Sequence, residues 1–87
     1  MDIDRLITQL KVHEGVRSKV YLDTEGIETI GVGRNLRDRG LSDDEIELML
    51  ANDIRDFQEE VESAFPWWSD MGDVRQRVVV DMAFNMG

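Results

Sequence analysis

Residues 13–33 read HEGVRSKVYLDTEGIETIGVG, and within them the pattern of the chain changes from that of a helix to that of strands. From Val20 to Gly33, apolar and polar side chains loosely alternate and β-branched residues are frequent, which is typical of strands. The run Asp23-Thr24-Glu25-Gly26 lies near the middle and has the composition of a turn. The sequence therefore predicts a β-hairpin near residues 19–33.

Before the hairpin, an amphipathic helix is predicted over residues 3–14. Apolar residues recur there at spacings of three and four, which place them on one helix face: Ile3, Leu6, Ile7 and Leu10. Either Asp2 or Asp4 can cap the amino end of this helix, and Gly15 can stop it.

After the hairpin, residues 34–40 have mixed charge and no periodicity, which predicts a loop. Ser42 and Glu45 then have the spacing of a capping box, so a long helix is predicted over residues 42–65. Its apolar stripe consists of Ile46, Met49, Leu50, Ile54, Phe57, Val61 and Phe65. Acidic residues occupy its other sides and predict a solvated face.

Pro66 breaks the long helix, and Asp73 can cap a final helix. The apolar stripe of that helix is Val74, Val78, Val79, Met82, Ala83 and Met86. Trp67 and Trp68 are predicted to plug the core between the two helices, with a sugar-stacking platform as the alternative. A final helix this apolar needs a partner surface. Together these elements indicate an α+β fold that is mostly helical.

Composition excludes several classes of function. The chain has no cysteine and one histidine, so thiolate chemistry, a His/Cys zinc site and a structural metal are not expected. The net charge of −9 disfavours nucleic acid and anionic membranes as partners. Residues 1–40 are neutral, with seven acids and seven bases, so all the excess negative charge lies in residues 41–87.

The amino end also lacks the features of a targeting segment. It has neither the basic head nor the unbroken apolar run of a signal peptide, and no stretch of the chain has the length of a membrane span. The chain is therefore expected to be made and kept in a cytoplasm unless something else releases it.

Two carboxyl groups near the hairpin suit the cleavage of a glycosidic bond, which needs one protonated acid and one carboxylate. Glu14 is predicted in the last turn of a helix, where the negative end of the macrodipole favours the protonated form that a general acid requires. Asp23 is predicted at a turn, where solvent and backbone amides keep it ionised, and the hydroxyl of Thr29 could hold a water beside it. The alternatives are a surface acid, a turn residue and an ordinary strand residue.

Three motifs, HEGVR at residues 13–17, VYLDTEG at 20–26 and TIGVG at 29–33, together resemble the signature of the phage-type lysozymes, glycoside hydrolase family 24. The resemblance implies that Glu14 is the general acid, that Asp23 acts on the nucleophilic water and that Thr29 assists it. Residues 74–87 resemble the family's helix through the second lobe, which implies that Phe84 and Asn85 face the substrate cleft. On the bare sequence, Phe84 is a core residue and Asn85 a helix-end residue.

The resemblance also implies an architecture. Residues 1–87 would form a single lysozyme-like domain, with an N-terminal lobe and its hairpin at 1–41, a long connecting helix at 42–65 and the start of a helical lobe at 66–87. Relative to the family the helical lobe is incomplete, and three explanations are open: a fragment or truncated gene product, a second chain or copy that supplies the missing lobe, or a binding role in place of catalysis. Because the last helix is so apolar, a homo-oligomer is expected, for example by exchange of that helix.

The implied function is that of an endolysin. It would hydrolyse the β-1,4 bond between N-acetylmuramic acid and N-acetylglucosamine of peptidoglycan, with inversion and without a cofactor. It would be made in the host bacterial cytoplasm and act on the periplasmic cell wall after release. The alternative is a truncated, non-catalytic module that binds glycan or a partner protein.

Overall fold

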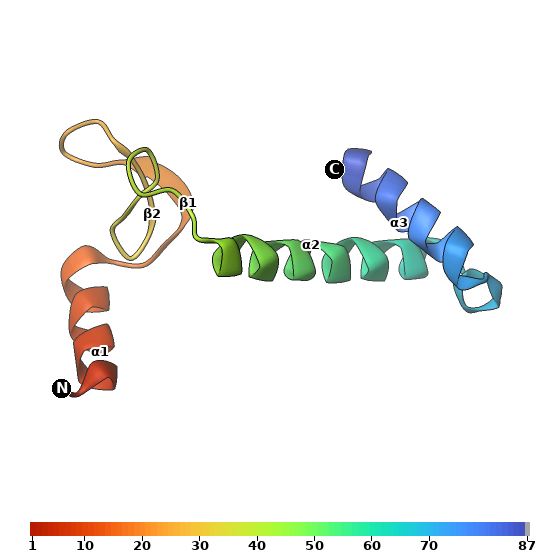
Figure 1. Cartoon of the computed structure of the whole chain (residues 1–87), viewed down its shortest axis with the longest axis horizontal. Coiled ribbons are helices and arrows are strands. Elements are labelled where there is room, and N and C mark those ends of the chain that lie inside the picture. The colour runs from red at the N-terminus through yellow and green to blue at the C-terminus, as the bar shows by residue number, and fades with distance from the viewer. Residues whose placement is uncertain (87) are drawn as a thin grey trace. The chain divides into compact units, whose positions relative to one another are not determined.

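A computed structural model describes residues 1–86 and has the expected α+β class. Within those residues it contains three α-helices, one short 3-10 helix and a three-stranded antiparallel sheet (Figure 1). The chain divides into two compact units, an N-terminal unit, Met1–Leu41, and a helical unit that begins at Ser42. No helix among the described residues is long and apolar enough to cross a membrane.

The first helix, α1, spans Ile3–Glu14, as the apolar spacing predicted. Of the two predicted caps, Asp2 is the one used, because its side chain accepts a hydrogen bond from the Arg5 amide at 3.0 Å. Gly15 ends the helix with φ of +76°, a conformation that glycine adopts without the steric cost of a Cβ atom. Its amide donates to the Lys11 carbonyl oxygen, so local sequence sets both ends of α1.

The predicted hairpin is present as β1, Arg17–Leu22, and β2, Glu28–Gly31, in the register Tyr21 opposite Thr29. The predicted loop at 34–40 is wrong at its start, because Arg34–Asn35 forms a third strand, β3, paired antiparallel with β2. Glycines at 31 and 33 have φ of +69° and +64°, and these left-handed conformations reverse the chain within three residues. A two-residue strand is too short to give a periodic signal in the sequence.

The helical unit begins with the predicted capping box. Ser42 accepts a hydrogen bond from the Glu45 amide, and the Glu45 carboxylate accepts one from the Ser42 amide at 2.8 Å. The long helix α2 then spans Asp43–Ala64 and ends before Pro66. A short 3-10 helix, η1, spans Trp68–Asp70.

The last helix, α3, spans Asp73–Met86 and runs back alongside α2 (Figure 1). Asp73 is its first residue, so the prediction that Asp73 caps the helix from outside is wrong by one position. The Asp73 carboxylate instead accepts a hydrogen bond from Arg77 at 2.9 Å, one turn further along. A tilted pair of rings, Phe57 and Phe84, joins α2 to α3 with their centroids 5.4 Å apart.

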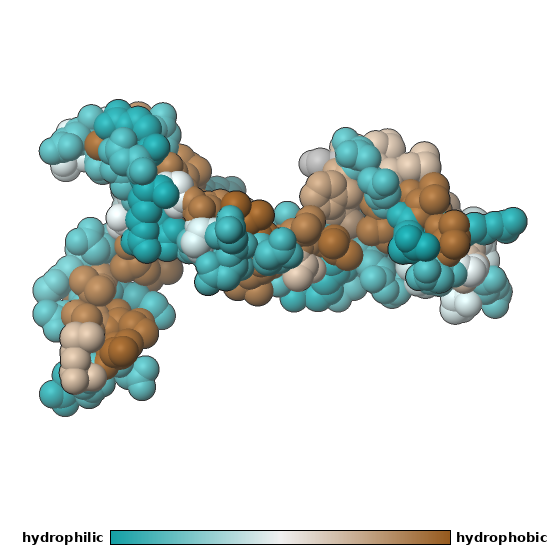
Figure 2. All heavy atoms as spheres, viewed as in Figure 1, coloured by the Kyte–Doolittle hydropathy of each residue, from teal (hydrophilic) through white to brown (hydrophobic). Residues whose placement is uncertain are grey.

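The buried core of the described residues is small. Among the apolar side chains of residues 1–86, only Ile27 and Val61 are buried. Most side chains in the apolar stripes of α2 and α3 keep a third or more of their surface exposed. The two tryptophans fill the space between the helices only in part. Trp68 is half-buried, whereas Trp67 is 55% exposed and packs against Phe65. Figure 2 shows the resulting hydrophobic surface over the helical unit.

Candidate active site in the N-terminal unit

Asp23 lies in the turn between β1 and β2, and backbone amides hold one of its two carboxylate oxygens. Its Oδ1 accepts hydrogen bonds from the amides of Glu25, at 2.8 Å, and Ile27, at 2.9 Å. This is an Asx turn, in which the side chain satisfies amides that the turn would leave unpaired. Within the described residues Oδ2 accepts no hydrogen bond, so the second oxygen is available to a ligand or a water.

Thr29 lies on β2 and is one of the most buried residues described, with 3% of its surface exposed. Its hydroxyl donates to the Ile27 carbonyl oxygen at 2.8 Å, and the same oxygen accepts from the Asp23 amide at 3.0 Å. Ile27 therefore links the two predicted site residues through its amide and its carbonyl. Because the single hydroxyl proton of Thr29 is used in this bond, its oxygen can only accept from a third group.

Glu14 is the last residue of α1 and is exposed. Its side chain lies against the backbone of Gly33, which follows β2: a Cβ atom at Gly33 would stand 2.9 Å from Glu14 Oε2 and 3.3 Å from its Cδ and Cγ. Only a residue without a side chain leaves room for the carboxyl group in this position. Gly33 thus leaves room for the Glu14 carboxyl beside the sheet.

Sequence reasoning named Glu14, Asp23 and Thr29 as candidates but not Ile27, which is hydrogen-bonded to two of them, or Gly33, which lies beside Glu14. The signal for Gly33 was the TIGVG motif at residues 29–33, because a glycine between strands marks either a tight turn or a close approach of another group. Ile27 acts through its backbone, and no side-chain pattern reports which amide an aspartate will accept from.

The two residues predicted to face the substrate belong to the helical unit. Phe84 is 38% exposed and its ring packs on Phe57, while the Asn85 side-chain amide donates to Asp81 Oδ1 at 3.0 Å. Asn85 lies inside α3, one residue before its end, as the bare sequence predicted. A substrate role for either residue stays a prediction.

In chemical terms the N-terminal unit offers an exposed carboxyl group at a helix end and a second carboxylate with one oxygen tied down and one open. Two such groups are the side chains that glycoside hydrolysis requires. Among residues 1–86 no three histidine or acidic side chains are grouped so as to hold a metal ion. The two carboxyl groups by themselves suit proton transfer by side chains.

A comparison with protein families identifies the chain's relatives. The model described as phage lysozyme matches residues 11–87, a range that contains all five predicted site residues. The chain belongs to the phage lysozyme family.

The chain is also similar to a curated protein, the pre-baseplate central spike protein Gp5 of Enterobacteria phage T4. The two are 28% identical over 106 residues, which cover 90% of this chain but 18% of the spike protein. The chain thus spans less than a fifth of the length of this relative.

Proposed function

We propose that this chain hydrolyses the β-1,4 bond between N-acetylmuramic acid and N-acetylglucosamine of peptidoglycan, with inversion at the anomeric carbon. The observation that carries the proposal is the state of Asp23: two backbone amides fix its Oδ1, while Oδ2 is left open in the same unit that holds Glu14. Membership of the phage lysozyme family supports the same chemistry.

The proposed reaction takes place in one displacement. Glu14 donates its proton to the glycosidic oxygen as the bond to the anomeric carbon breaks, and a water attacks that carbon from the opposite face. Asp23 Oδ2 accepts one proton of this water. Thr29 supports the water through its hydroxyl oxygen, which is an acceptor because its own proton is bonded to Ile27. With both of its protons directed at these acceptors, the water turns a lone pair towards the sugar.

The test is the release of reducing ends from purified peptidoglycan by the 87-residue chain, beside two variants that keep the shape of the site. Glu14→Gln removes the proton donor. Asp23→Asn keeps an Oδ1 that can accept from both amides, but it replaces Oδ2 with an NH₂ group that cannot take a proton. Each variant is expected to lower the rate by about 10²-fold or more, and Glu25→Gln, a change at an exposed acid of the same turn, serves as the matched control.

The stereochemistry is tested separately, by proton NMR of the first product formed. An α-anomer at the new reducing end supports inversion from a β-linked substrate, and a β-anomer refutes it. Equal rates for Glu14→Gln and the wild type would refute the assignment of the general acid.

A non-catalytic module that binds glycan is the second candidate, and the match to a small part of a spike protein favours considering it. The same samples separate the two functions. A folded wild-type chain that sediments with peptidoglycan without releasing reducing ends would support the binding module, whereas cleavage that Glu14→Gln abolishes without loss of sedimentation would support the enzyme.

A further inference from the structure

Two side chains of β1, Arg17 and Tyr21, lie on the face of the sheet that carries Thr29. Tyr21 is paired with Thr29 of β2, and opposite residues of an antiparallel pair point their side chains to the same face. Arg17 is paired with Gly31, two residues further along β2. Because Arg17 and Tyr21 are themselves four residues apart, β1 has an irregularity that brings them closer than a regular strand would. The Arg17 guanidinium carbon lies 5.1 Å from the centre of the Tyr21 ring.

Arg17 has a contact that restrains it but no acidic partner. Within residues 1–86 its side chain interacts with the Tyr21 ring, and none of its five side-chain N–H donors makes a hydrogen bond. A cation over an aromatic face is attracted by the ring, so the contact restrains the guanidinium without using its donors. The side chain is exposed, and space beside it is open, because a Cβ atom at Gly31 would meet nothing within 4 Å. Arg17 is therefore positioned to receive an anionic group.

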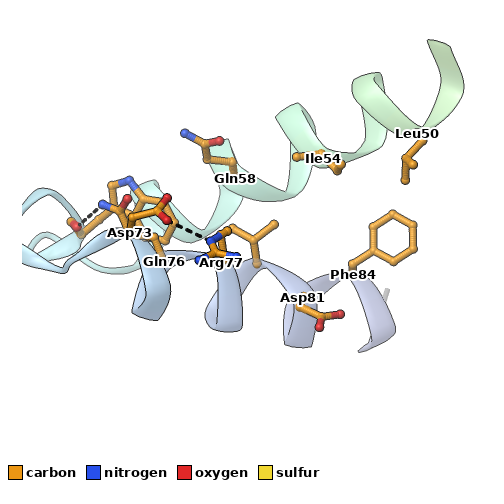
Figure 3. A pocket seen from close by; sticks show the side chains of 10 residues that line it. Leu50, Ile54, Gln58, Asp73, Gln76, Arg77, Asp81 and Phe84 are labelled. Carbon is orange, nitrogen blue, oxygen red and sulfur yellow. Dashed lines mark hydrogen bonds and ion pairs between the residues drawn. The ribbon is translucent and has the colours of Figure 1, made fainter. Parts of the chain in front are cut away.

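Other arginines of the described residues already have partners. In the helical unit, Arg77 lines an open groove of about 570 Å³ between α2 and α3, where it is paired with Asp73 at 2.9 Å (Figure 3). In the N-terminal unit, Arg34 donates to the Gly40 carbonyl oxygen at 3.2 Å. The helical unit has twelve acids and three arginines, so its field opposes the approach of an anion. An anionic ligand is therefore better received by Arg17, in the neutral N-terminal unit.

We propose that Arg17, held against the Tyr21 ring, binds a carboxylate of the glycan strand. This inference rests on the proposed function, because peptidoglycan is the source of the ligand. N-acetylmuramic acid carries a lactyl carboxyl group, which is either free or joined to a peptide that has carboxylates of its own. The guanidinium fork matches a carboxylate with two parallel N–H bonds. The interaction adds affinity for strands that carry carboxylates, and salt weakens it.

The experiment measures binding of soluble glycans to the full 87-residue chain carrying Glu14→Gln, which removes the proton donor assigned above. The probes are muramic-acid strands stripped of peptide, the same strands with peptides attached, and an N-acetylglucosamine oligosaccharide of equal length, which has no carboxylate. Isothermal titration calorimetry gives the Kd of each probe, and NMR follows the Nε–Hε signal of Arg17 in the same titrations. That signal is expected to shift with a carboxylate-bearing strand and to stay in place with the oligosaccharide.

One pair of variants tests the charge. Arg17→Gln removes the cation, and the matched control Arg39→Gln makes the same change at an exposed arginine of the same unit. Arg17→Gln is expected to weaken binding of a carboxylate-bearing strand about fivefold or more at low salt and to leave the oligosaccharide unaffected. Arg39→Gln is expected to change neither. Arg17→Lys keeps the charge but not the fork, so it is expected to lose part of the affinity.

A second pair tests the ring. Tyr21→Phe keeps the aromatic face and is expected to leave binding unchanged. Tyr21→Leu removes that face and is expected to weaken binding when Arg17 is present but not when it is replaced by glutamine. Circular dichroism checks the fold of each variant. If Tyr21→Leu unfolds, the NMR signal of Arg17 tests the proposal without a substitution on β1.

The two kinds of strand identify the source of the carboxylate. A loss confined to the peptide-free strand assigns the ligand to the lactyl group, and a loss confined to the other strand assigns it to the peptide. The proposal is overturned if Arg17→Gln binds both strands as tightly as its parent, if the oligosaccharide is weakened equally, or if Arg39→Gln has the same effect. Because binding is measured without cleavage, failure of the wild type to release reducing ends would refute the hydrolase and leave this result standing.

Discussion

Gly33→Ala is the substitution that most directly tests how the site is built. The added Cβ would stand 2.9 Å from Glu14 Oε2, and ordinary contact begins at 3.4 Å, so the carboxyl group has to move by about 0.5 Å. A misplacement of about 1 Å can cost roughly 10²-fold in rate, which predicts a loss of about tenfold for this shift. The left-handed φ of +64° adds a cost in stability of about 1 to 2 kcal/mol for any residue with a Cβ atom.

Gly31→Ala separates the two effects. Gly31 has a similar φ of +69°, but a Cβ there would meet nothing within 4 Å. Both variants are expected to unfold at lower urea concentration by a similar amount, while only Gly33→Ala is expected to shift the ¹³C NMR signal of the Glu14 carboxyl carbon and to lower the rate of release of reducing ends. If Gly31→Ala moved that signal equally, or Gly33→Ala left it in place, the assigned role of Gly33 would be wrong.

Three further outcomes follow from the local contacts. Ser42→Ala removes the helix cap and is expected to lower the free energy of unfolding, measured in urea, by about 1 kcal/mol. The same change is expected to raise the pKa of Asp44 in an NMR titration, because the hydrogen bond from the Ser42 hydroxyl lowers that pKa. Hydrogen bonds from Asn35, and to a smaller extent from Arg37, lower the pKa of Asp38, so Asn35→Ala is expected to raise this pKa in the same titration. The contribution of Asp38 to stability is complete above the ordinary aspartate pKa and is lost as pH falls through the lowered value. Val61→Ala, at a buried site, is expected to lower the free energy of unfolding by about 2 kcal/mol, measured by urea denaturation.

The helices could be predicted closely because their signals are local. The bounds of α1 depend on an apolar spacing, one aspartate cap and one glycine stop, all within a few residues of each other. The start of α2 depends on the capping box of Ser42 and Glu45, which needs no other part of the chain. The same reasoning placed Asp23 in a turn, where the structure has it.

The third strand and the burial of side chains could not be predicted in this way. Arg34–Asn35 becomes a strand because β2 offers it unpaired backbone groups across a turn with two left-handed glycines, and nothing in its own two residues favours a strand. The sequence likewise marks Trp67 and Trp68 equally as core residues. Only the path of the chain around η1 leaves Trp67 exposed and brings the Trp68 carbonyl oxygen within reach of the Gln76 side-chain amide, which donates to it.

What the sequence by itself determined is therefore the set of helices, the hairpin, the family motifs and the sign of the charge on each part of the chain, because these follow from spacing, caps and composition. The tertiary structure alone decided that Gly33 leaves room for Glu14, that the Thr29 hydroxyl proton is used by Ile27, and that an open groove lies between α2 and α3. The first and the last depend on atoms brought together from different elements, and the second depends on a local backbone conformation. The free energy of such contacts is set by separations in space that the order of residues does not contain.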